Sequence, residues 1–76
     1  MPRSDPDQEQ VRLAMVETLE RILRLDVRHC QQAALHGLNH IATPQERALL
    51  IDPFLRMPRD EKLIAYAREC RDGRAQ

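Results

Sequence analysis

The sequence predicts an all-α domain whose four helices are arranged as two stacked αα-hairpins or as a compact helical bundle. Apolar residues recur at spacings of three and four along most of the chain, and helix start and stop signals separate the apolar segments. With 76 residues, the chain has room for a single domain, residues 1–76. We expect residues 1–4 and 73–76 to fray.

The first helix is predicted over about residues 6–25. Asp5 can cap it, Pro6 suits its first position, and Gln8 can complete a capping box. One face carries an apolar stripe made of Val11, Ala14, Met15, Val16, Leu19, Ile22, Leu23 and Leu25. The opposite face carries two pairs of opposite charge at the i,i+4 spacing, Glu17–Arg21 and Glu20–Arg24.

The second helix is predicted over residues 27–41, with Asp26 as its capping residue. The connection to the first helix is nearly absent, so the two should form a tight αα-hairpin or corner. The predicted apolar face contains Val27, Cys30, Ala34, Leu35, Leu38 and Ile41.

The third helix begins at the strongest local signal of the chain, Thr43-Pro44-Gln45-Glu46. Thr43 caps, Pro44 takes the first helical position, and Glu46 completes a capping box. The helix, residues 43–57, is apolar nearly all round, so we expect it to be the most buried element. Pro53 should kink or break it near residues 49–52.

The fourth helix starts after Met57-Pro58, carries two acids near its first turn, and ends at Gly73 as the residue after the C-cap. Its predicted buried stripe is Leu63, Tyr66, Ala67 and Cys70. Two cysteines are too few for a disulfide framework, so we interpret Cys30 and Cys70 as reduced, partly buried thiols.

The segment Asp26-Val27-Arg28, followed by Gln32-Ala33-Ala34-Leu35, resembles the first helix of a HEAT-like repeat. The capped third helix would be the second helix of that repeat, so the resemblance covers about residues 26–57. The chain departs from the family pattern where His36 stands between Leu35 and Gly37. The resemblance implies stacked hairpins and a scaffold or interaction role, without catalytic residues. About three such repeats are needed to bury their faces, and this chain offers about two.

Composition and charge exclude several classes of function. The formal net charge is zero, which argues against a nucleic-acid binder that relies on excess positive charge. No apolar run approaches the roughly 18 residues of a membrane span. The first ten residues are polar and acidic, unlike a signal peptide, so we expect a cytoplasmic protein.

Catalysis finds no support in the residue pattern, so the chain is not expected to be an enzyme. No serine or cysteine has a base and an orienting acid at motif spacing. Gly37 and Gly73 are the only glycines, which excludes a glycine-rich phosphate loop, and no cofactor is predicted.

Three histidines of the second helix form the sharpest candidate site. His29, His36 and His40 fall within about 40° of one another, roughly opposite the apolar face. Ala33 and Gly37 lie beside them, so we predict that His29, Ala33, His36, Gly37 and His40 form an interaction surface. Such a surface would be sensitive to pH.

The predicted function is that of a small protein–protein interaction module, acting as an adaptor, an inhibitor or an assembly subunit. Its partner would be another protein or a second copy of itself. One alternative is a metal-binding helical protein, because His36 and His40 have the i,i+4 spacing that lets two imidazoles hold one ion. A further alternative is a DNA-binding regulator. The helix-turn-helix pattern fails for that alternative, since Thr43 and Pro44 fall where an apolar recognition helix should begin.

Overall fold

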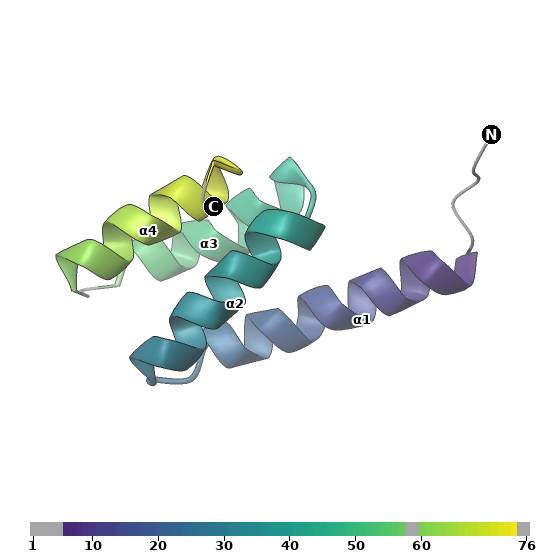
Figure 1. Ribbon diagram of the computed structural model, residues 1–76, viewed down its shortest axis with the longest axis horizontal. Coiled ribbons are helices and arrows are strands. Elements are labelled where there is room, and N and C mark those ends of the chain that lie inside the picture. Colours follow the sequence, from purple (N-terminus) through teal and green to yellow (C-terminus); the bar gives the residue numbers. More distant parts are fainter. Residues whose placement is uncertain (1–5, 58–59, 75–76) are drawn as a thin grey trace.

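The computed structural model describes residues 6–57 and 60–74, and helices account for most of them. The helices are α1 (Pro6–Leu23), α2 (Arg28–Ile41), α3 (Pro44–Leu55) and α4 (Glu61–Arg71) (Figure 1). α1 packs on α2 and α3 packs on α4, which confirms the predicted all-α class and its two hairpins. Within the described ranges, none of the helices combines the length and apolar character that a membrane span requires.

The centre of the fold is α2, which contacts each of the other three helices. Ala34, Leu35 and Leu38 are buried on it, together with one polar side chain, Gln31. The amide of Gln31 donates to the Leu23 carbonyl at 3.3 Å and so satisfies a group at the end of α1. Around this helix the core contains Val16, Leu23, Ala42, Ile51, Phe54, Leu63, Ala67 and Cys70.

The expectation that the third helix is the most buried is wrong. α3 buries only Ile51 and Phe54, and Leu49 remains 74% exposed. Its main contact is with α4, its contact with α2 is small, and Leu50 and Leu55 are only partly buried. A helix that is apolar nearly all round therefore sits at the edge of this domain.

Two of the predicted helix signals are wrong. Asp26 does not cap α2, because Val27 occupies the N-cap position in an extended conformation, without a side-chain capping bond. Pro53 does not break α3 near residues 49–52, because it lies in the last turn and the helix continues to Leu55. A proline this close to a helix end disturbs few backbone hydrogen bonds.

Other helix signals are confirmed. Thr43 Oγ1 accepts a hydrogen bond from the Glu46 amide at 3.2 Å, and Glu46 Oε1 accepts one from the Thr43 amide at 2.8 Å. Gly73, with φ 72°, follows the C-cap of α4, and its amide donates to the Cys70 carbonyl at 3.1 Å. The predicted cap of α1, Asp5, lies outside the described residues.

The predicted apolar stripe of α1 is only partly buried. Val16 and Leu23 are buried, whereas Val11 is 59% and Met15 49% exposed. α1 crosses α2 obliquely, and its N-terminal half projects beyond the other helices (Figure 1). That half has an apolar side and little of the fold to cover it.

Candidate interaction surface

The five residues predicted to form one interaction surface border two separate hollows. His29, Ala33 and His36 line an open hollow of about 490 Å³ that Tyr66 of α4 and Gln32 complete. Gly37 and His40 instead line a groove on the side of α1.

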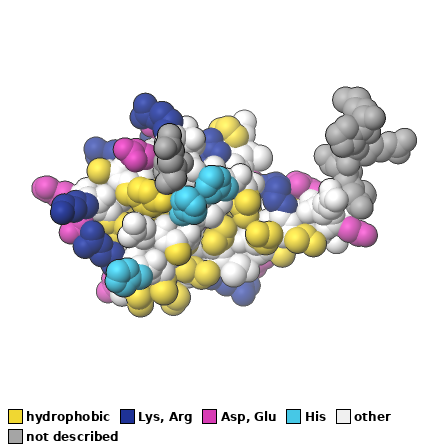
Figure 2. All heavy atoms as spheres, in the orientation of Figure 1, with side chains coloured by type: hydrophobic (Ala, Val, Ile, Leu, Met, Phe, Trp, Pro, Cys, Tyr) yellow, Lys and Arg dark blue, Asp and Glu magenta, His cyan; other side chains and the backbone are white. Residues whose placement is uncertain are grey.

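His36 and His40 stand between these two hollows as a contacting pair. Their rings meet edge to face, with centroids 4.5 Å apart and planes at 75°. His36 Nδ1 also lies 3.2 Å from the Tyr66 hydroxyl, which links the pair to α4. Both imidazoles are exposed, and Figure 2 shows two imidazoles in contact and a third apart from them.

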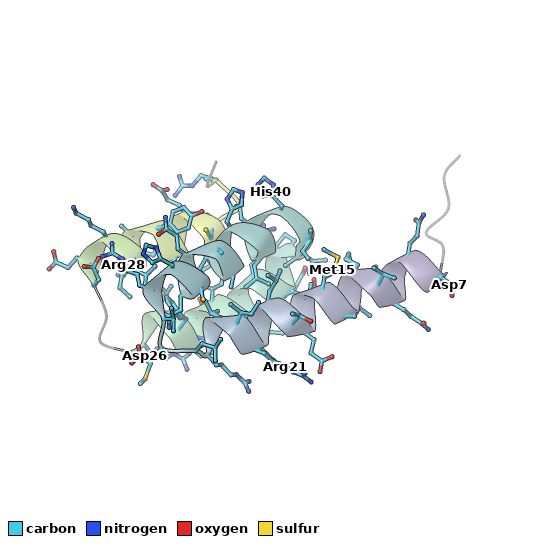
Figure 3. The ribbon with its side chains drawn as sticks, turned by 60° about the horizontal axis from the view of Figure 1, so that its bottom comes forward. Asp7, Met15, Arg21, Asp26, Arg28 and His40 are labelled. Atoms are coloured by element: carbon cyan, nitrogen blue, oxygen red, sulfur yellow. The ribbon has the colours of Figure 1, made fainter. Side chains whose placement is uncertain are left out.

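An apolar groove runs between the middle of α1 and the C-terminal half of α2. We call it the α1–α2 groove; its volume is about 460 Å³, and its walls are Val11, Ala14, Met15, Thr18, Leu19, Gly37, His40 and Ile41. Figure 3 labels one residue of each wall, Met15 and His40. Figure 2 shows hydrophobic side chains gathered along this side of the molecule.

The polar residues of the α1–α2 groove disturb its apolar character little. The hydroxyl of Thr18 donates to the Ala14 carbonyl of its own helix at 2.9 Å, so its hydrogen-bonding capacity is met within α1. Within the walls, His40 is the one side chain that can carry a charge. The groove is therefore suited to an apolar surface.

Gly37 sets how closely the two walls approach each other. A Cβ at this position would lie 2.9 Å from Leu19 Cδ1 and 3.0 Å from Leu19 Cδ2. Contacts this short require Leu19 to move, so the glycine permits the observed packing of α1 on α2.

Arg12 holds α1 against the ends of two other helices. Its Nη1 donates to Glu46 Oε1 at 2.7 Å and to the Ile41 carbonyl at 3.0 Å, and its Nε donates to Glu9 Oε1 at 2.8 Å. These bonds join α1 to the C-terminus of α2 and the N-terminus of α3, directly beside the groove.

The electrostatic effect of Arg12 is largest at Glu46. The hydrogen bond from Arg12, followed by that from the Thr43 amide, lowers the pKa of Glu46 to about 2. The pKa of Arg12 is raised in turn, first by Glu9 and then by Glu46. Sequence reasoning missed this contact, because nothing local connects Arg12 with a glutamate beyond the next helix.

A third hollow, between α1 and α3, has a volume of about 240 Å³. Its walls are Glu20, Leu23, Arg24, Leu49, Leu50, Pro53 and Phe54. It is smaller than the α1–α2 groove, and it is more polar because Glu20 of α1 and Arg24, the residue after α1, form part of it.

The metal and thiol chemistry of the described residues is sparse. Residues 6–57 and 60–74 contain no cluster of three histidine, cysteine or acidic side chains placed to hold one ion. The His36–His40 pair therefore offers two ring nitrogens without a third such ligand. Cys30 is half-buried, and Cys70 is buried in the core, where loss of solvent raises the pKa of its thiol.

Comparison of the chain with protein-family models, with curated proteins and with solved structures finds no match. The HEAT-like resemblance consequently receives no support from a family match. The description that the structure supports is a small all-α domain of four helices.

Proposed function

We propose that this chain is a small, non-enzymatic protein-interaction module whose α1–α2 groove binds an apolar helical surface of a partner. The observation that carries the proposal is the exposed apolar wall on α1, where Val11 and Met15 remain about half exposed. Contiguous exposed apolar surface marks interaction sites, and a groove between two helices accepts the apolar face of a third.

The predicted site residues take different parts in this proposal. Gly37 and His40 belong to the wall of the groove, and His36 contacts His40 at its edge. His29 and Ala33 lie on the α4 side and would contact only a partner that extends across α2.

The HEAT-like interpretation fits the same proposal. A hairpin taken from a stacked array leaves apolar surface that the next hairpin would cover. On this interpretation the chain acts in the cytoplasm as an adaptor, an inhibitor or an assembly subunit, and its partner continues the stack.

The proposal is tested by affinity purification of the tagged chain from its native cells after nuclease treatment, with mass spectrometry as the readout. Met15→Arg places a charge in the groove and should remove a stoichiometric partner from the eluate. Leu49→Arg is the matched control, because Leu49 is exposed on α3, outside the groove. Retention of that partner by Met15→Arg would contradict the proposal.

The geometry of His36 and His40 favours a second candidate function, the binding of a divalent transition metal. Their ring centroids are 4.5 Å apart on one exposed helix face, close enough for both to approach one ion. Calorimetric titration of untagged protein with Zn²⁺, Ni²⁺ and Cu²⁺ tests it. We expect one ion per chain, and His40→Ala should abolish binding; absence of binding by the native chain rejects this candidate.

A further inference from the structure

We propose that the occupant of the α1–α2 groove is α1 of a second copy of this chain, packed antiparallel to the first across a two-fold axis near Ala14. This inference rests on the proposed function and names its partner. The inference follows from three features of α1. These are its exposed apolar side, the positions of Asp7 and Arg21, and the small residue Ala14 midway between them.

The apolar side of α1 is self-complementary. Of the groove walls, five residues come from α1: Val11, Ala14, Met15, Thr18 and Leu19. The same exposed side is a ridge of the kind that a groove between helices accepts. Because the N-terminal half of α1 projects beyond the other helices, a second copy has access to the apolar side of α1 (Figure 1). A two-fold contact requires one patch to serve both copies, and this patch can do so.

The charges of α1 specify the direction of the second helix. The first turn is acidic, with Asp7 and Glu9, and the last turn is basic, with Arg21. A parallel pair would place like charges together. An antiparallel pair places Asp7 of each copy beside Arg21 of the other and also opposes the two helix dipoles favourably.

Asp7, Ala14 and Arg21 are spaced by heptads, so they lie within about 40° of one another on α1. This line is about 160° away from the buried Val16, on the side of α1 that faces solvent. A two-fold axis at Ala14 brings both Asp7–Arg21 contacts into register at once. Alanine at the crossing point also allows the two helices to approach closely.

The existing ion pair of Arg21 is compatible with this contact. Arg21 Nη2 donates to Glu17 Oε1 of its own helix at 2.8 Å, and both side chains are well exposed. A guanidinium has five N–H donors, so Arg21 can keep this bond and donate to Asp7 of the second copy as well.

The first test is the mass of the untagged full chain in solution, measured by sedimentation from about 1 µM to about 1 mM. We expect a species of twice the chain mass of 8.9 kDa. Met15→Arg should give the monomer at every concentration, whereas Leu49→Arg should behave as the native chain. Circular dichroism confirms that each variant retains its helices.

The second test reverses the charges. Asp7→Arg and Arg21→Asp should each weaken self-association by about tenfold at low salt, because both symmetric contacts become repulsive. Mixing the two variants should restore association, since every contact then joins opposite charges. Failure to recover on mixing would overturn the antiparallel arrangement.

Other outcomes separate this inference from the proposed function. A native chain that is monomeric throughout overturns the second copy as occupant, even where Met15→Arg still releases a foreign protein in the purification experiment. If the native chain is a dimer and Met15→Arg does not dissociate it, the dimer uses another face of the molecule. That result likewise overturns the inference.

Discussion

Gly37 is the residue at which a single added carbon would alter the distance between α1 and α2. Gly37→Leu should destabilise the fold by about 1–3 kcal/mol, because Leu19 already occupies the space that the new side chain needs. Gly37→Ala should stay within about 1 kcal/mol of the native chain, since its better helix propensity offsets the small displacement of Leu19. Urea unfolding measures both, with Ala33→Leu on the exposed side of α2 as the control. If Gly37→Leu and Ala33→Leu lowered the free energy of unfolding equally, α1 and α2 would not be in close contact at Gly37.

Glu46 makes the stability of the fold depend on acid. Its pKa is lowered from 4.5 to about 2, so its contribution is complete above pH 4.5 and is lost as the pH falls toward 2. Glu46→Gln keeps the shape of the capping box and removes the charge that faces Arg12. We expect it to lower the free energy of unfolding by about 1–2 kcal/mol at pH 7, after allowance for solvent screening. The difference from the native chain should vanish near pH 2.

Unfolding curves of both proteins between pH 2 and pH 7 would show this convergence. Glu61→Gln is the control, because it removes the same formal charge from an exposed position at the start of α4. A constant difference across the pH range would mean that Glu46 acts through packing and not through its charge.

At the scale of one helix, the caps of α3 and α4 at Thr43 and Gly73 were predictable, whereas the N-cap of α2 and the burial of each helix were not. Thr43, Glu46 and Gly73 form their bonds with close sequence neighbours, so their residue types suffice to predict them. Val11 and Val16 are the same residue on the same helix, yet Val16 is buried and Val11 is exposed. What separates them is the crossing of α1 over α2, and no local pattern encodes that angle.

Two of the predicted N-cap residues, Thr43 and Asp26, give a matched pair of variants. Thr43→Ala should cost about 1 kcal/mol of stability, because the Glu46 amide loses its acceptor. Asp26→Ala should cost much less, because Val27 and not Asp26 occupies the N-cap of α2. Thermal unfolding of both variants measures the difference. A larger effect of Asp26→Ala would place the start of α2 one residue earlier.

At the scale of the whole molecule, stability depends on the helix in the middle. Leu35 is fully buried on α2, which packs against the other three helices. Leu35→Ala should cost about 2–5 kcal/mol, a large share of the stability that a domain of this size has. Leu49→Ala removes the same atoms from an exposed position on α3 and should be nearly neutral. If chemical denaturation showed that Leu35→Ala and Leu49→Ala lose similar amounts of stability, α2 would not be the central helix of the fold.

The candidate site illustrates the same dependence on tertiary packing. Helical spacing was enough to place His36 beside His40, and their rings do meet. It could not show that Tyr66 stands beside His36 or that Gly37 and His40 face α1, because α1 and α4 are remote in sequence. Both α1 and α2 contribute residues to the groove, so the sequence pattern of one helix alone does not reveal it.

The projecting half of α1 has a consequence for the exchange of backbone amide protons. Its first turns lie beyond Arg12, the residue that bonds to the Ile41 carbonyl and to Glu46. Amides there can exchange with solvent by local fraying, whereas those near the buried Val16 exchange only when the domain unfolds. A partner helix that extends from the groove past Val11 along α1 would suppress the fraying, so the exchange rate at this end of α1 reports whether such a helix is bound.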